Sequence, residues 1–194
     1  VADELGLPFE KVTVSSPDTD MTPYDKSTSS SRTTFHMGQA AQKAAREIRN
    51  QLLDVTARAL EARVEDLELK DGAACVRGVP EKRLSITEIF KARFGSSVGS
   101  MFGGHCFKTE GGLNPKTGKG KAAAFWFFSA CGAEVEVDVQ TGKVRVLRAV
   151  TAVDAGKAIH PRQCDLQNEG SMLSGLGSAL FEEMVYDNGQ PINS

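Results

Sequence analysis

The 194-residue chain lacks the features that define several large protein classes. Its four cysteines, at positions 75, 106, 131 and 164, form no C-x-x-C pair, which excludes a zinc knuckle or a redox dithiol. We expect four reduced thiols, mostly buried. There is no signal peptide, and no apolar run approaches the ~20 residues that span a bilayer, so we expect a cytoplasmic protein. The formal charge of -2 provides no field that would attract nucleic acid or anionic lipid.

The usual signatures of a catalytic or nucleotide site are also missing. No G-x-S-x-G elbow and no Cys/His pair indicates a nucleophile with its base, so no catalytic residue is assigned. His36, His105 and His160 have no spacing typical of a metal site. The stretch "GLNPKTGKGK" has neither the first glycine nor the final hydroxyl of a phosphate-binding P-loop. The residues therefore predict a binding region without a complete catalytic set.

The bulk composition is that of an ordinary globular protein. Apolar residues make up 40% and charged residues 25% of a chain long enough to bury a core unaided. The first residues, "VADELGLP", indicate the last turns of a helix stopped by Gly6 and Pro8, and Asn188-Gly189 predicts a hairpin turn close to the other end. We expect residues 1–194 to be a single piece of a longer protein, the alternative being a processed chain with frayed ends.

Residues 1–62 are expected to contain a strand, a loop and a long helix. Val12 and Val14 alternate with polar neighbours, which predicts a short strand. From Phe35 to about Leu60 the apolar residues recur every three or four positions, as on one face of a helix.

Residues 63–122 are expected to contain a strand region, a short helix and a glycine-rich loop. The stretch "DLELKDGAACVRG" predicts strands that turn at Asp71-Gly72. Ser85 and Glu88 form a capping box for a helix that Gly95 ends. Residues 95–121 form either a functional excursion or a disordered segment.

Residues 123–194 are expected to form a β-hairpin and a helix rich in small residues. The hairpin turns at Thr141-Gly142, and a two-residue loop would place Val137 opposite Val146 and Asp138 opposite Arg145. The helix begins at Pro161 and repeats small residues at a spacing of four, which predicts close approach of another backbone or a flat ligand. Together these elements predict an α+β fold, a mixed or antiparallel sheet packed against long helices.

A cluster of hydroxyl residues precedes the first long helix. From residue 27 to residue 34 every residue except Arg32 carries a hydroxyl, more than one helix cap requires. The start of a helix favours an anion, hydroxyls add neutral donors and Arg32 adds a charged one, so the cluster suits a pyrophosphate. The alternative is a Ser/Thr-rich linker. Gln167 and Glu169 are able to hydrogen-bond a heterocycle, or are ordinary surface residues.

Three segments taken in order resemble the molybdenum-binding large subunit of the molybdenum hydroxylases. They are "TSSSRTTFHMGQA", "GAEVEVDVQTGKVRV" through "VDAGKAIHP", and "DLQNEGSMLSGLGSALFEEMVYDNGQPIN". The family includes xanthine dehydrogenase, aldehyde oxidoreductase, carbon monoxide dehydrogenase and 4-hydroxybenzoyl-CoA reductase. The resemblance is weakest between about residues 62 and 122. It departs from the family pattern at His160, where relatives commonly have asparagine, and at Ser174-Gly175, where they often have Gln-Gly.

The resemblance implies a molybdopterin cofactor, extended to the cytosine dinucleotide in bacteria. It implies that Ser30, Ser31, Arg32 and Thr33 hold its phosphate and pterin groups, and that Gln167 lies near the pterin. It also implies iron-sulphur and FAD partners, on other domains or subunits, and a small aldehyde, N-heterocycle, carbon monoxide or aroyl-CoA substrate that is hydroxylated or reductively dehydroxylated.

The catalytic glutamate of the family lies in a G-x-G-E segment, which does not occur here, so this piece alone is expected to be inactive. It is also expected to be empty of cofactor, because the family's other cofactor-binding loops lie outside it and too few contacts remain. A second hypothesis remains open, a non-catalytic α+β module that binds an anion or a peptide.

Overall fold

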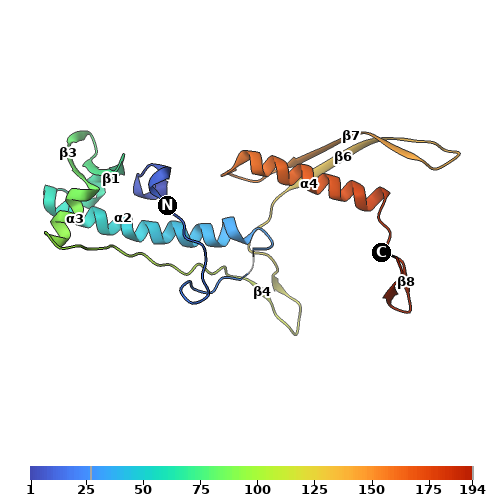
Figure 1. The fold of residues 1–194 in the computed structure, drawn as a ribbon, viewed down its shortest axis with the longest axis horizontal. Helices are drawn as coiled ribbons and strands as arrows, with labels where there is room; N and C mark the ends of the chain where they lie inside the picture. Colours follow the sequence, from blue (N-terminus) through green and yellow to red (C-terminus); the bar gives the residue numbers. More distant parts are fainter. Residues whose placement is uncertain (27, 194) are drawn as a thin grey trace. The chain divides into compact units, whose positions relative to one another are not determined.

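The structure is a computed structural model that describes residues 1–26 and 28–193 and divides into two compact units, unit 1 (residues 1–110) and unit 2 (residues 111–194) (Figure 1). No helix in the described part of the chain combines the length and the apolarity needed to cross a membrane.

Unit 1 is built around helix α2, Gly38–Leu60, which continues a π-helical turn η2, Thr33–Met37. The helix predicted from Phe35 to about Leu60 is confirmed, and its helical backbone begins two residues earlier. Its apolar positions recur every three or four residues, so one face can be buried. That face carries Ala45, Leu52, Leu53, Val55 and Thr56.

A three-stranded antiparallel sheet packs against α2. Its strands are β1, Leu67–Lys70, β2, Ala73–Val76, and β3, Val79–Ser85. The predicted turn at Asp71-Gly72 is confirmed, with φ of 49° and 74° as a tight hairpin turn requires. Strand β3 was not predicted, because its run of Pro, Glu, Lys and Arg is not alternating. It is an exposed edge strand, where charges are tolerated.

Two short helices flank the three-stranded sheet along the chain. Helix α3, Ile86–Phe94, has the predicted capping box between Ser85 and Glu88, and Gly95 ends it with φ of 66°. Helix η3, Val64–Asp66, joins α2 to the sheet. Both predicted signals at the ends of α3 are therefore confirmed.

The N-terminal segment agrees with one prediction and contradicts another. Helix α1, Ala2–Leu5, ends at Gly6 as predicted, and Gly6 O accepts a hydrogen bond from Gly72 N at 2.8 Å. The strand predicted around Val12 and Val14 is wrong: a short 3-10 helix η1, Phe9–Lys11, is followed by irregular backbone. Val14 is 88% exposed, because two alternating valines without a neighbouring strand have nothing to pair with.

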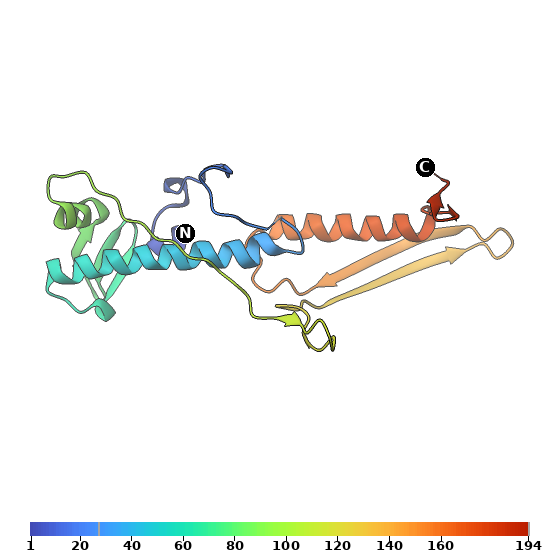
Figure 2. The same cartoon turned by 90° about the horizontal axis from the view of Figure 1, so that it is seen from below.

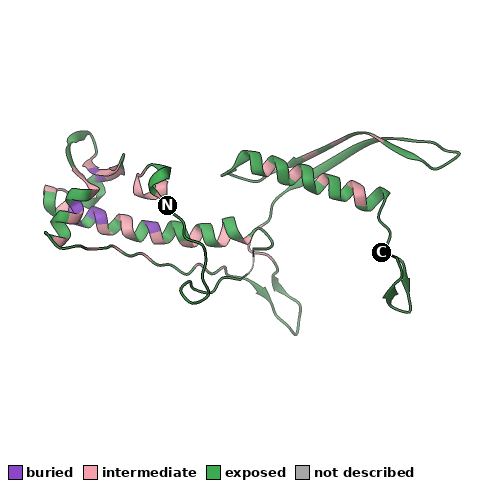
Figure 3. Ribbon diagram, in the orientation of Figure 1, coloured by how far each residue is buried: buried purple, intermediate pink, exposed green. Residues whose placement is uncertain are grey.

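The core lies entirely in unit 1, as Figure 3 shows. Its centre is formed by Leu52 of α2, Leu67 of β1, Ala74 of β2 and Ile89 of α3. The expected core is therefore present in unit 1, whereas none of the described residues of unit 2 is buried.

The small extent of the core also determines how exposed the cysteine side chains are. None is in a disulfide, as expected, but Cys106 and Cys131 are exposed and Cys75 and Cys164 are half-buried. The prediction that they are mostly buried is wrong, because only unit 1 has an interior.

The glycine-rich loop contains an ordered segment, residues 101–110, which we call the strap. It has no regular secondary structure and runs beside α2 (Figures 1 and 2). This part of the loop therefore contacts α2. Beyond it, β4, Gly112–Leu113, and β5, Gly120–Lys121, form a small hairpin, and Asn114 Oδ1 accepts from Lys116 N at 2.9 Å in its loop.

The main elements of unit 2 are the hairpin β6, Ser129–Val137, and β7, Val144–Val153, with helix α4, Pro161–Leu180, beside it (Figure 2). Helix α4 begins with Pro161, as predicted. The Asn188-Gly189 turn is also confirmed, between β8, Tyr186–Asp187, and β9, Gln190–Pro191.

The predicted register of the hairpin is wrong by two residues. Val137 lies opposite Val144 rather than Val146, and Glu136 lies opposite Arg145. Asp138 does not pair with Arg145, because its carboxylate accepts from Gln140 N at 2.9 Å inside a longer loop. These hydrogen bonds lower the pKa of Asp138. Next to the turn, a shift of two residues leaves Val135, Val137, Val144 and Val146 on one shared face. Beyond the irregularity at Glu134/Val135, the pairing differs from the prediction by one residue.

Candidate functional site

The hydroxyl turn, Ser30, Ser31, Arg32 and Thr33, leads directly into the helix of unit 1. Ser30 and Ser31 have φ of 53° and 59°, in the left-handed region. For residues other than glycine this conformation costs roughly 1–2 kcal/mol each. Arg32 then enters right-handed helical backbone with φ of -67°. The two serines thus bend the chain so that helical N–H groups follow at once.

The hydroxyls of this turn do not cap the helix. Neither η2 nor α2 has a side-chain cap, and within residues 1–26 and 28–193 no hydrogen bond involves the side chains of Ser30, Ser31 or Thr33. All three residues are exposed. Helix capping therefore does not explain them, and their role in binding a ligand stays a prediction.

Arg32 contributes a buried donor without a partner. The residue is half-buried, and its Nε is inaccessible to solvent yet makes no hydrogen bond among the described residues. A buried donor left unpaired costs about 1–3 kcal/mol. His36 Nδ1 is in the same condition one helical turn later. Two such nitrogens at one helix opening call for a polar ligand atom or water.

The His36 ring is held by two aromatic rings and by the strap. Its centroid lies 5.2 Å from that of Phe35 and 5.9 Å from that of Phe107, and Phe35 and Phe107 are 5.9 Å apart, all edge-to-face. His36 Nε2 lies 3.4 Å from Thr109 Oγ1. Lys43 Nζ lies 4.8 Å from the centre of the Phe107 ring. The start of the helix is thus fixed to the end of the strap.

Polar contacts and one glycine fasten the rest of the strap to α2. Gln51 Nε2 donates to Phe102 O at 2.8 Å, and Gly104 N donates to Glu47 Oε2 at 3.2 Å. Between them, a β-carbon on Gly103 would lie 2.9 Å from Ile48 Cγ1. Only a glycine allows this approach, so the strap has a defined position along the helix.

Gln167 lies on the exposed surface of α4 in unit 2. Its Nε2 donates to Ser171 Oγ at 3.2 Å, one helical turn further on. Since the hydroxyl turn belongs to unit 1, a shared site of Gln167 with Ser30, Ser31, Arg32 and Thr33 stays a prediction. The small-residue stripe beside it is also open: a β-carbon on Gly170 or Gly175 would meet nothing within 4 Å.

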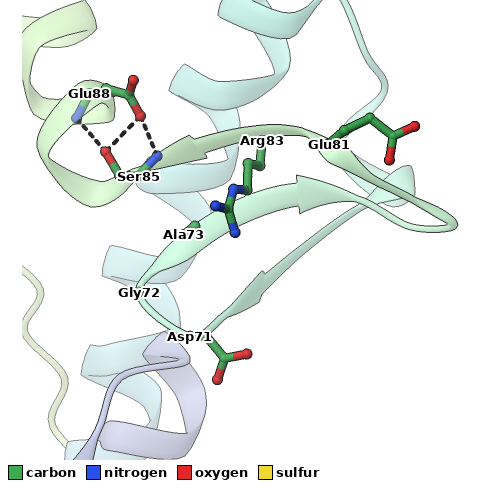
Figure 4. A pocket seen from close by; sticks show the side chains of 7 residues that line it. All are labelled: Asp71, Gly72, Ala73, Glu81, Arg83, Ser85 and Glu88. Atoms are coloured by element: carbon green, nitrogen blue, oxygen red, sulfur yellow. Dashed lines mark hydrogen bonds between the residues drawn. The ribbon is translucent and has the colours of Figure 1, made fainter.

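A concave region of about 440 Å³ lies on the β2–β3 side of unit 1, apart from the hydroxyl turn (Figure 4). Glu88 in its wall is already engaged, because its carboxylate accepts from Ser85 N at 2.8 Å and from Ser85 Oγ at 2.7 Å. These hydrogen bonds lower the pKa of Glu88. The other lining residues mix both charges and indicate no ligand, namely Asp71, Gly72, Ala73, Glu81, Arg83 and Ser85.

The sequence predicted the hydroxyl turn as a site but did not indicate its neighbours in the fold. His36 was assigned no ligand role, because the predicted helix began at Phe35 and did not include Arg32, which the structure places four residues earlier at the start of η2. Phe107 and Thr109 had no such signal, because only the fold brings the strap to the helix. In the described part of the chain, no three metal-binding side chains gather. The donor set of hydroxyls and a guanidinium suits an anion.

The chain is similar to large redox enzymes along its whole length. A family profile described as "Molybdopterin cofactor-binding domain" matches residues 1–194. The nicotine 6-hydroxylase large subunit of Paenarthrobacter nicotinovorans is 34% identical over 96% of this chain and 22% of its own. The carbon monoxide dehydrogenase large chain of Afipia carboxidovorans is 28% identical over 96% of this chain and 22% of its own.

Two solved structures resemble this chain in fold. A Cu,Mo-CO dehydrogenase superimposes with a TM-score of 0.75 at 27% identity, over 98% of this chain and 23% of that one. Quinoline 2-oxidoreductase from Pseudomonas putida 86 has the same fold, with a TM-score of 0.78 at 24% identity over 99% of this chain and 24% of that one. The chain thus spans less than a quarter of the length of these proteins.

Proposed function

Because the chain belongs to the molybdopterin cofactor-binding domain family, we propose that it is part of the large subunit of a molybdenum hydroxylase and holds the phosphate end of the cofactor. The parent enzyme hydroxylates, or reductively dehydroxylates, a small aldehyde, an N-heterocycle, carbon monoxide or an aroyl-CoA. The similarity to a nicotine 6-hydroxylase large subunit and to a carbon monoxide dehydrogenase large chain supports the N-heterocycle and carbon monoxide members of this range.

The residues of unit 1 fit a cofactor that ends in phosphate groups. The observation that carries this assignment is Arg32 Nε, a buried donor that no described residue satisfies. A phosphate oxygen at the start of η2 would accept from it and from the first helical N–H groups. The hydroxyls of Ser30, Ser31 and Thr33 add uncharged donors around the same point.

The residues proposed to hold the cofactor position it and take no part in making or breaking bonds. When bound, the cofactor supplies a molybdenum centre at which oxygen from water is transferred to the substrate and two electrons are taken up. Arg32 and the three hydroxyls fix the phosphate end, and Gln167 hydrogen-bonds the pterin. A rigidly held cofactor keeps its reactive end in a constant place, which is what positioning contributes to catalysis.

The rest of the enzyme lies outside these residues. We place the catalytic glutamate in another part of the parent polypeptide, since no G-x-G-E segment occurs here. The cofactor is the cytosine dinucleotide form, the electron acceptors are iron-sulphur and FAD domains or subunits, and the complex works in the cytoplasm. The naming of one relative as subunit gamma of a dehydrogenase complex supports a multisubunit assembly.

The test compares Arg32→Ala with Arg58→Ala in the full-length subunit, expressed in a host that makes the cofactor. Arg58 is an exposed arginine near the other end of α2 and serves as the matched control. Molybdenum and released cytidine nucleotide are measured per subunit after gel filtration. We expect cofactor retention about tenfold weaker for Arg32→Ala, the value of one charged hydrogen bond, and no loss for Arg58→Ala. Equal occupancy in both variants would remove Arg32 from the site.

A further inference from the structure

Arg32 and His36 present two buried nitrogens on one side of the same helix opening. Arg32 Nε and His36 Nδ1 are both shielded from solvent, and neither has a partner among the described residues. Residues four apart in helical backbone lie on one face, one turn from each other. A single ligand group at the helix start is therefore able to contact both side chains.

The two nitrogens of His36 have different surroundings. Nε2 lies 3.4 Å from the hydroxyl of Thr109, which is able to donate or to accept. Nδ1 has no such group among the described residues. The ring itself is wedged edge-to-face between Phe35 and Phe107, so it cannot turn to exchange the two positions without moving both rings. Whatever satisfies Nδ1 must come from outside these residues.

We propose that His36 is a further cofactor-binding residue, whose Nδ1–H donates a hydrogen bond to an oxygen of the phosphate group that Arg32 also contacts. In this arrangement the proton is on Nδ1 and Nε2 is an acceptor, to which the Thr109 hydroxyl is able to donate. The strap is thus able to satisfy Nε2 in the tautomer that holds an anion. The role rests on the proposed function, because it assigns His36 to the same phosphate group.

The strap is built to keep Thr109 in this place. Phe107, two residues before Thr109, packs on the His36 ring and carries Lys43 Nζ on its face at 4.8 Å. Gly103 and Gly104 fix the middle of the strap to α2. Thr109 is thus a positioning residue that acts through His36.

Two amide substitutions separate this role from a purely structural one. The side-chain nitrogen of asparagine is as far from Cβ as Nδ1 is, whereas that of glutamine reaches the place of Nε2. His36→Asn keeps a donor toward the ligand and loses the Thr109 contact. His36→Gln keeps the Thr109 contact and loses the donor toward the ligand.

The experiment uses the full-length subunit and measures cytidine nucleotide and molybdenum retained after gel filtration, with no activity assay. We expect His36→Asn to retain close to the wild-type amount and His36→Gln to retain the cofactor about tenfold less tightly. Thr109→Val, which keeps the side-chain shape, is expected to weaken retention several-fold. His105→Asn, an exposed histidine on the strap, is the control and should match the wild type.

Hydrogen exchange of residues 101–110 reports whether the strap is still in place in each variant. Loss of cofactor in His36→Gln with the strap still protected supports the proposal. If His36→Gln retains the cofactor and His36→Asn loses it, the proposal is overturned, and His36 serves only to hold Thr109 in place. Equal retention in all variants would overturn it too. A wild-type subunit that retains neither molybdenum nor nucleotide would instead refute the proposed function itself.

Discussion

The α-carbon of Gly103 lies so close to α2 that a β-carbon built on it would overlap the carbonyl oxygen of Ala44. Backbone therefore meets backbone at the middle of the strap. Gly104, the next residue, has open space at the same place. Two adjacent glycines of one chain thus have opposite tolerance to a methyl group.

We predict that Gly103→Ala displaces the strap and Gly104→Ala does not. Forcing a methyl group into this contact costs about 1–3 kcal/mol in unfolding free energy. Hydrogen exchange of residues 101–110 in the full-length subunit should accelerate in Gly103→Ala only. Equal protection in both variants would show that the backbone contact is absent in solution.

Separated at residue 110, the two units are expected to behave differently. Residues 1–110 contain every buried residue of the described chain and should keep helical circular dichroism and dispersed amide resonances. Residues 111–194 offer a two-stranded hairpin and an exposed helix, which are marginal alone in water. Cooperative thermal unfolding of the second fragment would contradict this expectation.

A pH-dependent contribution is expected from Glu4 of α1. Arg46 Nη2 donates to Glu4 Oε1 at 2.8 Å, and this hydrogen bond lowers the pKa of Glu4 from its ordinary value of 4.5. A lowered pKa stabilises the fold above the ordinary value, and the contribution is lost as the pH falls through the folded value. Glu4→Gln should therefore reduce the denaturation midpoint of residues 1–110 at pH 7, and the deficit should shrink as the pH falls below 4.5. A deficit that persists at the acidic pH would indicate lost packing instead of lost charge.

For Gln167 we predict a contribution to cofactor retention through its side-chain amide. Its Nε2 donates to Ser171 Oγ in this structure, so Ser171 holds the amide over the exposed face of α4. Gln167→Ala should release pterin several-fold faster from the loaded subunit, as removal of one hydrogen bond requires. Gln163→Ala, one turn earlier on the same helix, is the control. Identical release from both variants would exclude Gln167 from the site. Pterin fluorescence of the filtrate measures the release.

Local signals in the sequence predicted local structure well. The turn residues Asp71 and Gly72, the capping box of Ser85 and Glu88 and the proline at the start of α4 each act within a few residues, and all are confirmed. The strand at Val12 failed because strand formation depends on a partner elsewhere in the chain. The hairpin register failed because the Asp138 carboxylate stabilises a longer loop.

The candidate site likewise has one part that the local sequence indicates and one part that only the fold brings together. Ser30, Ser31, Arg32 and Thr33 are adjacent along the chain, so their common chemistry is recognisable from the sequence alone. The role proposed for His36 depends on its contacts with Phe107 and Thr109, which are more than seventy residues away along the chain. No pattern of neighbouring residues could have shown that pairing.

The long sequence separation between the strap and the residues of α2 that it contacts also affects how fast the strap docks and undocks. Its contacts close loops of 51, 57 and 73 residues, while α2 needs only local hydrogen bonds. Local structure forms early in folding and long-range contacts form late, so the strap should still be undocked at the rate-limiting barrier. Weakening it therefore speeds unfolding and leaves the folding rate almost unchanged. The lifetime of the closed strap, rather than the speed of its formation, is what a substitution at Gly103 alters.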